Sequence, residues 1–208
     1  MEKAIVITGG AGFIGSALAR RLEGDDLPIV AVDNLHPQIH PEQKRPDSLP
    51  SFVILQVGDV TQSSTWDEVL ARWEPEIVIH LAAETGTGQS LMESTRHADV
   101  NVVGTTAMLD AFSRRAVKPK HVILASSRAV YGEGAWLDEL GSVFYPAPRS
   151  HAILAAGQWD PVSPGGKGKV AALAHSAATV FPAPTSVYGA TKLAQEHILT
   201  AWCGAMQV

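Results

Sequence analysis

The sequence predicts an α/β fold, a doubly wound parallel sheet with helices on both faces. Short runs rich in Val and Ile recur along the chain, and stretches with helical spacing separate them. The runs are continuous rather than alternating, as expected for strands that are buried on both faces of a parallel sheet. Alternating strands and helices of this kind form right-handed βαβ units. The expected strands are residues 4–8, 28–32, 52–57, 77–81 and 121–126.

The expected helices of the first half follow from apolar residues that recur on one stripe. The first stripe begins with Phe13 and Ile14 and runs to Leu22, directly after the first strand. The second runs from Trp66 to Trp73, between the third and fourth strands. Each stripe predicts a helix that packs against the sheet.

Two further helical segments are expected in the second half. Residues 91–117 are long enough for one extended helix or two, with Gly104 as a weak point. Residues 187–202 form another helical pattern, with Gly204 as its stop. The apolar residues 205–208 then resemble the start of a sixth strand, so we expect a fragment of a longer chain, with a frayed natural tail as the alternative.

Two segments interrupt the pattern of strands and helices. Residues 35–50 contain four prolines and are expected to form an exposed loop. Residues 132–185 are rich in Pro and Gly and have no strong periodicity. A connection of that length in a compact domain is usually functional or mobile. We therefore expect one domain over residues 1–208 that carries a long insertion at about 132–185.

Composition and charge limit the classes of partner. The chain has 208 residues, of which 46% are hydrophobic and 18% charged, which is enough to bury a core. A net charge of −5 argues against nucleic acid or an anionic membrane as the main partner. No apolar run approaches the roughly 20 residues that span a bilayer, and the N-terminus does not resemble a signal peptide. The single cysteine, Cys203, excludes an internal disulfide, so the expected location is the cytoplasm.

The eight histidines do not predict a metal site. His36 and His40 are four residues apart, but Pro37 and Pro41 prevent a regular helix between them. No acidic or cysteine partner completes a recognisable ligand set, so we expect no bound metal. His80 lies inside an expected strand, which favours a hydrogen-bonded core histidine over a catalytic one.

A glycine-rich turn follows the first expected strand. From Gly9 to Gly15 the sequence reads Gly-Gly-Ala-Gly-Phe-Ile-Gly and leads directly into the first expected helix. Glycine lets the chain turn sharply and lets backbone N–H groups approach a pyrophosphate, which the positive end of the helix dipole also attracts. Glycines also serve ordinary turns, but a position between a strand and a helix favours a dinucleotide site of the Rossmann type.

An acidic residue ends the second expected strand. The carboxylate of Asp33 can accept hydrogen bonds from the adenosine ribose hydroxyls and would repel a 2′-phosphate. No Arg or Lys occupies positions 33–37. Asp33 could also be a turn aspartate, but its place after the glycines favours NAD over NADP. Asp59, after the third strand, could contact the adenine or cap the next helix.

A tyrosine and a lysine stand four residues apart in the last expected helix. This spacing puts Tyr188 and Lys192 on one helix face, one turn apart. A nearby cation stabilises phenolate and so lets a tyrosine act as a base, while lysine can also hold the nicotinamide ribose. Ser126 and Ser127 end the fifth expected strand, at the sheet edge where ligands bind. A serine there can brace a substrate oxygen, although both serines could simply end a strand.

Motifs along the whole chain occur in the order typical of one family. They lie at residues 8–15, 32–34, 58–60, 80–83, 101–105, 126–132 and 188–192. Together they resemble the extended short-chain dehydrogenase/reductase family, in particular its NAD-dependent nucleotide-sugar epimerases and dehydratases. The loop at residues 84–90 resembles a bacterial subgroup that includes dTDP-L-rhamnose 4-epimerase-like enzymes.

The resemblance implies a role for each matching position. The implied catalytic residues are Ser127, Tyr188 as the base and Lys192 as its partner. Glu84, Thr85 and Ser127 are implied to contact a nucleotide-sugar substrate. NAD is the implied cofactor, and the residues implied to bind it are Gly9, Gly12, Phe13, Ile14, Gly15, Asp33, Asn34, Asp59, Val60, Leu81, Ala82, Ala83, Asn101, Ser126, Tyr188 and Lys192.

The activity that the family implies is NAD-dependent 4-epimerisation of a nucleotide sugar. Such an enzyme oxidises the sugar transiently to a 4-keto intermediate and returns the hydride to the other face. Family dehydratases carry an Asp-Glu pair after the catalytic threonine, whereas this chain has Arg128 and Ala129, which points away from dehydration. The alternatives are a nucleotide-sugar dehydrogenase or reductase, and a catalytically silent NAD-binding module.

The family also implies an assembly and a further region. Its members often form homodimers through the helices that here carry residues 101–116 and 188–202. They also have a C-terminal substrate-binding region, which we expect to be absent from this sequence.

Overall fold

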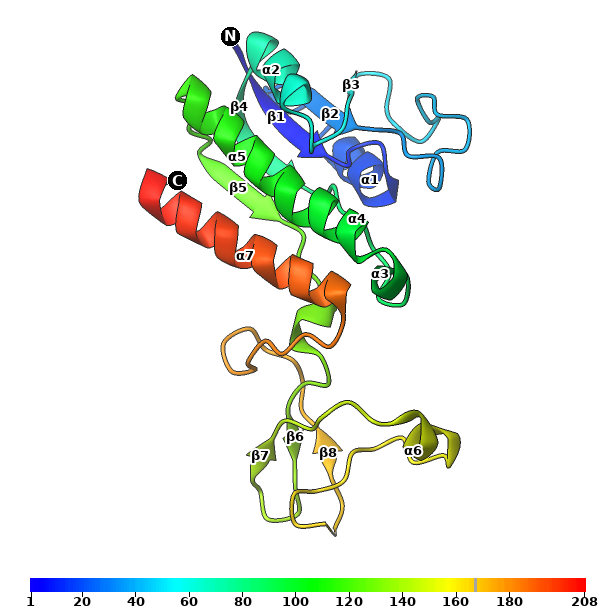
Figure 1. Cartoon of the computed structure of the whole chain (residues 1–208). Coiled ribbons are helices and arrows are strands. Elements are labelled where there is room, and N and C mark those ends of the chain that lie inside the picture. Colours follow the sequence, from blue (N-terminus) through cyan, green and yellow to red (C-terminus); the bar gives the residue numbers. More distant parts are fainter. Residues whose placement is uncertain (167) are drawn as a thin grey trace.

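The centre of the structure is a five-stranded parallel sheet with the strand order β3-β2-β1-β4-β5 (Figure 1). This computed structural model describes residues 1–166 and 168–208. The order is that of a Rossmann fold, in which strand addition reverses direction between β1 and β4. The predicted fold class is therefore confirmed. The strands are β1 Glu2–Thr8, β2 Ile29–Asp33, β3 Ile54–Val57, β4 Trp73–His80 and β5 His121–Leu124.

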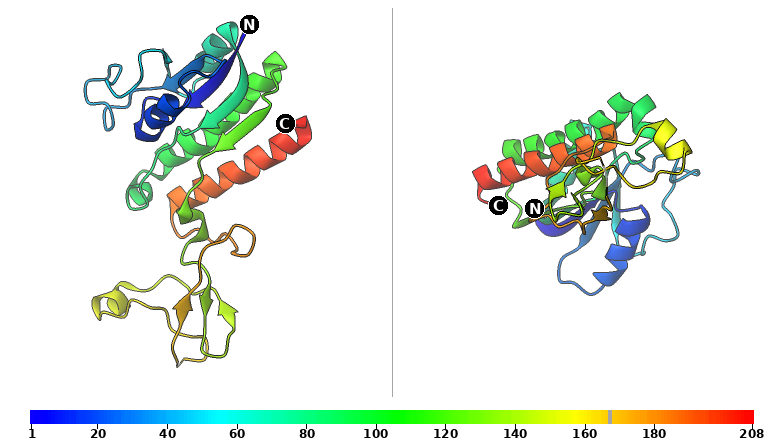
Figure 2. Two further views of the ribbon diagram at one scale, coloured as in Figure 1. Left: turned by 180° about the vertical axis from the view of Figure 1, so that it is seen from behind. Right: turned by 90° about the horizontal axis from the view of Figure 1, so that it is seen from below.

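Helices cover both faces of the sheet (Figure 2). The core divides accordingly into two layers, one between the sheet and α1 and one between the sheet and α2, α5 and α7. The helices are α1 Phe13–Arg21, α2 Ser63–Arg72, α3 Gln89–Met92, α4 Ser94–Ala98, α5 Gly104–Arg115, α6 His151–Ala155 and α7 Val187–Met206.

Successive side chains along each strand point to opposite faces of the sheet, so each strand contributes residues to both core layers. Val6 and Val32 face the layer that contains α2, α5 and α7, whereas their neighbours Ile7 and Ala31 face the layer that contains α1. All four side chains are buried. Because both faces are covered, the strands carry apolar residues at successive positions, which explains the continuous runs in the sequence.

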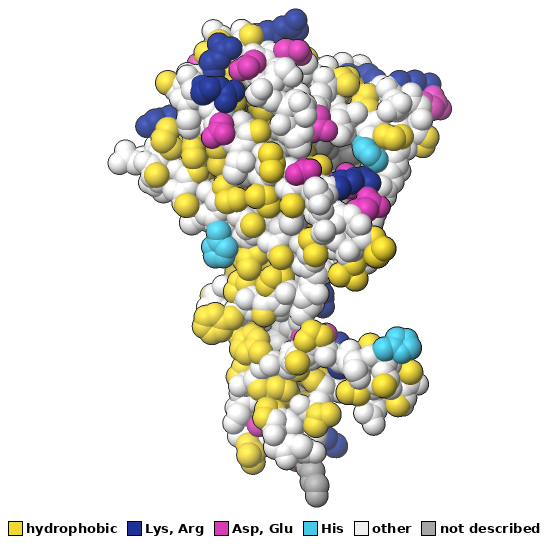
Figure 3. All heavy atoms as spheres, viewed as in Figure 1, with side chains coloured by type: hydrophobic (Ala, Val, Ile, Leu, Met, Phe, Trp, Pro, Cys, Tyr) yellow, Lys and Arg dark blue, Asp and Glu magenta, His cyan; other side chains and the backbone are white. Residues whose placement is uncertain are grey.

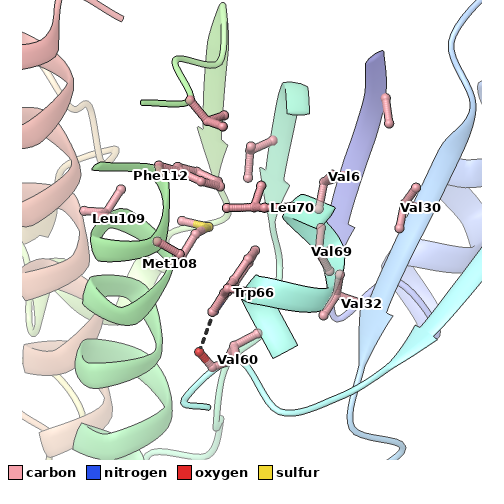
Figure 4. Packing of buried hydrophobic residues seen from close by; sticks show 14 of the residues in the cluster. Val6, Val30, Val32, Val60, Trp66, Val69, Leu70, Met108, Leu109 and Phe112 are labelled. Atoms are coloured by element: carbon pink, nitrogen blue, oxygen red, sulfur yellow. Dashed lines mark hydrogen bonds between the residues drawn. The ribbon is translucent and has the colours of Figure 1, made fainter. Parts of the chain in front are cut away.

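Trp66 of α2 lies in the larger core layer (Figure 4). Its indole is fully buried and meets the ring of Phe112 edge-on at 5.9 Å. The indole Nε1 donates a hydrogen bond of 2.8 Å to the carbonyl oxygen of Val60. That bond satisfies the polar atom of the indole and fixes a residue just beyond β3, at the carboxyl end of the sheet.

The two predicted apolar stripes were wrong at their ends. Phe13 and Ile14 begin α1 but are 90% and 62% exposed, because the helix starts beyond the carboxyl ends of the strands. Trp73 does not belong to α2. Its backbone is extended, and it is the first residue of β4.

The loop at residues 35–50 has no helix or strand, as its prolines predict. It is not uniformly exposed, however. Leu35 and Leu49 are each only 3% exposed and join the core layer beside α1. These two leucines therefore anchor the loop to the sheet, whereas the sequence predicted an exposed loop.

Residues 89–115 form the short helix α3 and then one continuous helical run from Ser94 to Arg115, in agreement with the expectation of one helix or two. A π-helix, Asp99–Val103, joins α4 to α5 without a break. Gly104 is not a weak point, since its backbone is α-helical. A Cβ at Gly104 would lie 2.8 Å from Cγ2 of Val60, so glycine lets α5 approach the segment after β3 closely.

The last helix is longer than predicted. It passes through Gly204 and ends at Gln207, whose φ of 58° lies in the left-handed region. Ala205 and Met206 belong to this helix instead of a sixth strand. Gly204 is therefore not the helix stop.

Between β5 and α7 the chain leaves the sheet and forms a small separate lobe, the insertion lobe (residues 132–185; Figure 1). Its strands form an antiparallel sheet with the order β7-β6-β8. Hydrophobic side chains are spread over its surface in Figure 3, and Leu140 and Trp159 are 90% and 66% exposed. The strands are β6 Trp136–Leu137, β7 Val143–Phe144 and β8 Ala171–Ala172.

The two ends of the insertion lobe lie together. The N–H of Ala183 donates a hydrogen bond of 2.9 Å to the carbonyl oxygen of Val130. The ring of Tyr131 stacks on His175 with 5.1 Å between the ring centroids. Gly132 has a φ of 58°, and a Cβ there would collide with the carbonyl oxygen of Ala183. The neck of the lobe is thus tightly packed.

Within the described parts of the chain, no helix is both long and apolar enough to cross a membrane. The same residues contain no group of three or more His, Cys, Asp or Glu side chains that could hold a metal ion.

Candidate active site

A cavity of about 380 Å³ opens at the carboxyl ends of the strands. It is lined by the turn between β1 and α1, the end of β2 with the loop that follows it, the segments after β3 and β4, and residues Arg96 and Val100. Ligands of open α/β sheets bind at this edge. The structure thus brings together the following predicted site residues: Gly9, Gly12, Phe13, Ile14, Gly15, Asp33, Asn34, Asp59, Val60, Leu81, Ala82, Ala83, Glu84 and Thr85.

The glycines of the first turn are required by close approach. Gly9 has a φ of 64°, and a Cβ there would lie 2.8 Å from the backbone N of Ala82. A Cβ on Gly15 would lie 2.6 Å from Cα of Gly10. Gly12 is the N-cap of α1 and has no side chain that could satisfy the first N–H groups of the helix. Those N–H groups remain available to an anion in the cavity.

Asp33 ends β2 and is held by the backbone on two sides. Its Oδ2 accepts a hydrogen bond of 3.1 Å from the N–H of Ala11, and its Oδ1 accepts one of 2.9 Å from the N–H of Leu35. The side chain is 9% exposed, on the cavity side. Each carboxylate oxygen keeps a free lone pair, so the residue can still accept hydrogen bonds from a diol.

Asp59 and Asn34 form a second polar group on the cavity wall. The Nδ2 of Asn34 donates a hydrogen bond of 3.1 Å to Oδ2 of Asp59. Oδ1 of Asp59 accepts from the N–H and the hydroxyl of Thr61, at 2.9 and 2.7 Å. Burial opposes ionisation, but the hydrogen bonds from Thr61 and Asn34 outweigh it and lower the pKa of Asp59. The wall therefore carries a stable negative charge near β3.

Asn101 does not line the cavity. It is fully buried in the π-helix and binds the backbone of Glu84 at two points. The Glu84 N–H donates to Oδ1 of Asn101 at 2.8 Å, and Nδ2 of Asn101 donates to the Glu84 carbonyl oxygen at 3.0 Å. Nδ2 also donates to Oγ1 of Thr191 at 2.9 Å. Asn101 thus fixes the segment after β4 to α7, behind the wall of the cavity.

The helix that carries Tyr188 lies directly against the segment after Ser127. A Cβ on Gly189 would lie 2.5 Å from the carbonyl oxygen of Ala129, so glycine permits this contact. Ser186 caps α7 and accepts a hydrogen bond of 3.0 Å from the Gly189 N–H. The Tyr188 ring meets the buried ring of His97 edge-on at 6.5 Å. Tyr188 and Ser127 therefore belong to touching elements.

The two serines at the end of β5 have other partners. Oγ of Ser127 accepts a hydrogen bond of 3.1 Å from the Ala129 N–H and caps the short 3-10 helix Arg128–Tyr131. Oγ of Ser126 donates to the carboxylate of Glu196 on α7. Among the described residues, no hydrogen bond joins Ser127 to Tyr188. The structure places the elements that carry these two residues in contact without a hydrogen bond between the two side chains.

Lys192 is buried, with only 2% of its surface exposed. Its Nζ donates a hydrogen bond of 2.5 Å to Oε1 of Gln195. Burial lowers the pKa of Lys192 to about 8, although the carboxylate of Glu196 acts in the opposite direction. Lys192 does not line the cavity.

An arginine that the sequence analysis missed crosses the mouth of the cavity. Arg96 of α4 pairs with Glu84 at 2.8 Å and with Glu93 at 2.7 Å. Its Nη2 also lies 3.4 Å from Nε2 of His36, in the loop after β2. His36 and His40 both line the cavity wall. No local motif marks Arg96, because its partners Glu84 and His36 come from other segments of the chain.

A second cavity, of about 360 Å³, lies beside the start of α7. Thr87 and Gly88 line it on one side, and Arg128 lines it on the other. The segment after β4 therefore borders both cavities, with Thr85 at the first and Thr87 at the second. The remaining lining residues are Leu91, Ala129, Gly132, Thr185 and Ser186.

The strand order, the glycine turn and the acidic end of β2 define a dinucleotide-binding fold of the Rossmann class. Comparison with known proteins narrows this class. The NAD dependent epimerase/dehydratase family model matches residues 5–150, and the chain belongs to that family.

Relatives with known names span this chain almost completely. It is 54% identical over 200 residues to dTDP-L-rhamnose 4-epimerase from Burkholderia thailandensis, covering 96% of this chain and 53% of that protein. It is 30% identical to a probable dTDP-glucose 4,6-dehydratase from Sinorhizobium fredii, covering 95% of this chain and 48% of that protein. The chain thus spans about half the length of the curated relatives it matches.

A solved structure agrees with the fold. The crystal structure of UDP-glucose 4-epimerase from Brucella ovis in complex with NAD superposes with a TM-score of 0.67 at 26% identity. The superposition covers 99% of this chain and 49% of that one.

Proposed function

We propose that this chain is the NAD-binding part of a nucleotide-sugar 4-epimerase that works by transient oxidation at C4. The observation that carries the proposal is the contact between α7 and the segment after Ser127. Gly189 permits this contact. In the sequence of α7, Tyr188 precedes this glycine by one residue and Lys192 follows it by three. The name of the 54% identical relative supports the same activity.

The residues of the first cavity suit NAD. The N–H groups at the start of α1 suit a pyrophosphate. Neighbouring backbone atoms leave no room for a side chain at positions 9 and 15, so both positions require glycine. Asp33 suits the diol of the adenosine ribose and disfavours a 2′-phosphate. When bound, NAD supplies a reversible hydride acceptor.

In this proposal each polar residue near α7 has a separate task. Tyr188, as phenolate, takes the proton of the C4 hydroxyl. Lys192, as a buried cation one turn away, stabilises the phenolate and holds the nicotinamide ribose. The hydroxyl of Ser127 donates a hydrogen bond to the C4 oxygen while its Oγ accepts the one from the Ala129 N–H. Glu84 and Thr85 contact the substrate from the segment after β4, which borders both cavities.

Arg128 and Ala129 favour epimerisation over dehydration. Removal of water from a sugar needs an acid and a base beside the catalytic hydroxyl. Both residues line the second cavity, and neither carries a carboxylate. The described residues that line this cavity include no Asp or Glu. A dehydrogenase, a reductase or a silent NAD-binding module remains an outcome that the experiment below distinguishes.

The proposal extends to organisation and location. Residues 1–208 would form one NAD-binding unit with the insertion lobe placed beside the substrate, and the substrate-binding region would come from further sequence. A cytoplasmic homodimer is proposed, with residues 101–116 and 188–202 in its interface, by resemblance to the family. A lone cysteine fits a reducing compartment.

The test is the substitution Tyr188→Phe in the natural protein at its full length. The substrates are UDP-, GDP- and dTDP-sugars, and NMR resolves the C4 epimers. We expect Tyr188→Phe to lower turnover about a hundredfold to ten-thousandfold, since it removes a general base. Tyr145→Phe, in the insertion lobe, is the matched control and should keep wild-type turnover. Unchanged turnover in Tyr188→Phe would remove this residue from the role of base.

A further inference from the structure

A chain of buried polar side chains runs beneath the site, from β1 to α7. It crosses the sheet from Thr8 to His80 of β4, continues through Thr105 of α5 and reaches Gln195 and Lys192 of α7. Four of these side chains are fully buried, and Lys192 is 2% exposed. No single sequence motif contains this network, because its members are distant in the chain.

The hydrogen bonds fix where the protons of this network lie. Oγ1 of Thr8 accepts the N–H groups of Leu81 and Ala82, at 3.2 and 3.1 Å, so its own hydroxyl donates to Nδ1 of His80 at 2.6 Å. The remaining proton of a neutral imidazole then sits on Nε2 and is donated to Oγ1 of Thr105 at 3.0 Å. Burial and the charge of Lys192 lower the pKa of His80 to about 3, which keeps the ring neutral.

The same reasoning orients the amide of Gln195. The Thr105 hydroxyl donates to the Asn101 carbonyl oxygen at 2.6 Å, so Oγ1 of Thr105 can only accept from other groups. Nε2 of Gln195 is a donor and lies 2.7 Å from that oxygen. Nε2 of Gln195 is also 3.2 Å from Nε2 of His80, since both donors converge on Thr105. Oε1 of Gln195 must therefore point the other way, to Nζ of Lys192 at 2.5 Å.

We propose that Gln195 is a positioning residue for Lys192, an oriented acceptor that holds the ammonium group in place beneath the site. This inference deepens the proposed function, because it rests on Lys192 being the partner of Tyr188. Thr105 and His80 hold the amide so that only its oxygen can face the lysine. The ammonium group is buried and bonded to an acceptor whose orientation is fixed, so it has little freedom to move.

The charged and titratable groups around Lys192 are few. Glu196 follows Gln195 on the same helix, and Tyr188 precedes Lys192 by one turn. From β4 comes His80, which is neutral, and from α4 comes His97, which packs on Tyr188. The facing part of α5 contributes the uncharged Thr105. Gln195 is thus the neutral group in direct contact with the ammonium, and substitutions there act on Lys192 without removing a charge.

The test follows the titration of Lys192 by NMR in chains that carry isotope-labelled lysine. The Lys192 signal is the one that disappears in Lys192→Met. Gln195→Met keeps the length of the side chain but removes the acceptor, so the titration midpoint should fall by about one pH unit. Gln195→Glu keeps an acceptor and adds a negative charge, so the midpoint should rise by about one unit or more. Leu199→Ala, a buried packing change on the same helix, should leave the midpoint unchanged.

A lower midpoint in Gln195→Met together with a higher one in Gln195→Glu supports the proposal. Any other pattern overturns it, and Gln195→Glu decides alone if Gln195→Met does not fold. A second readout is the affinity for NAD, which should fall about tenfold in Gln195→Met and stay at the wild-type value in Leu199→Ala. The titration needs neither NAD nor sugar. The titration can therefore be interpreted even if the chain is not an epimerase. A titration result that contradicts the role of Gln195 would in turn leave the epimerase proposal unaffected.

Discussion

The sheet and the insertion lobe are built in different ways. In the sheet, apolar residues from strands and helices are fully buried in two layers, as at Trp66 and Phe112. In the insertion lobe the strands are two residues long, and α6 has no buried residue. Trp159 of the lobe is 66% exposed. The sheet therefore supplies a rigid edge for the site, whereas the position of the insertion lobe depends on the contacts at its neck.

The neck of the insertion lobe consists of a few specific contacts. Tyr131 stacks on His175, and Glu133 pairs with Arg149 at 2.5 Å. Ala183 returns to the backbone of Val130 through one hydrogen bond. These contacts set the position of the lobe beside the second cavity. Substitutions in the two regions should therefore differ in cost.

The largest contrast is expected between two tryptophans. Trp66→Ala removes a fully buried indole and should lower the free energy of unfolding by about 3–5 kcal/mol. Trp159→Ala removes an exposed one and should change it by less than about 0.5 kcal/mol. Urea unfolding of both variants measures the difference. Equal losses would mean that the lobe has a packed core of its own.

A smaller contrast is expected between two glycines with positive φ. Gly9 has a φ of 64° and a neighbour 2.8 Å from an added Cβ, whereas Gly157 has a φ of 75° and nothing within 4 Å. Gly9→Ala should cost about 2–4 kcal/mol, from backbone strain and overpacking together. Gly157→Ala should cost only the strain, about 1 kcal/mol. Denaturant unfolding is the measurement, and a Gly157→Ala loss as large as that of Gly9→Ala would contradict this view of the first turn.

The third contrast concerns pH and distinguishes a buried histidine from one in the lobe. The folded chain holds the pKa of His80 at about 3, below its ordinary value of 6.5. Between these values the unfolded chain binds a proton that the folded chain does not. The free energy of unfolding therefore rises with pH, by at most about 1.4 kcal/mol per pH unit, and falls as the pH is lowered. Unfolding measured across this window should be less pH-dependent in His80→Gln. His175→Gln, in the lobe, should keep the wild-type dependence; the same profile in all three proteins would rule out this origin.

Much of the fold could be predicted because its signals are local. Continuous apolar runs predict strands buried on both faces, and the glycine turn between a strand and a helix predicts where the cavity opens. Asp33 and Asp59 were placed correctly at this edge because the ends of parallel strands meet there. The ends of elements were less predictable. Phe13 and Trp73 follow a helical spacing, but their positions relative to the sheet decide their burial.

The site residues that the sequence could not predict depend on partners far away in the chain. Arg96 meets Glu84 and His36 only after folding. Gln195 meets Thr105 and His80 across the core, and no spacing rule connects them. Asn101 carries a family motif, yet its position behind the cavity wall follows from its bonds to Glu84. Hydrogen-bond networks of this kind become visible only when the sheet brings their elements together.

The most direct test of the proposed chemistry is the fate of the C4 hydrogen. The natural protein at its full length is incubated in deuterated water with NAD and the nucleotide sugar that it turns over in the panel of UDP-, GDP- and dTDP-sugars, and NMR follows the sugar while absorbance follows NADH. Transient oxidation at C4 predicts an inverted product that keeps protium at C4, with no net NADH. Deuterium at C4, or NADH that accumulates with turnover, would contradict the account.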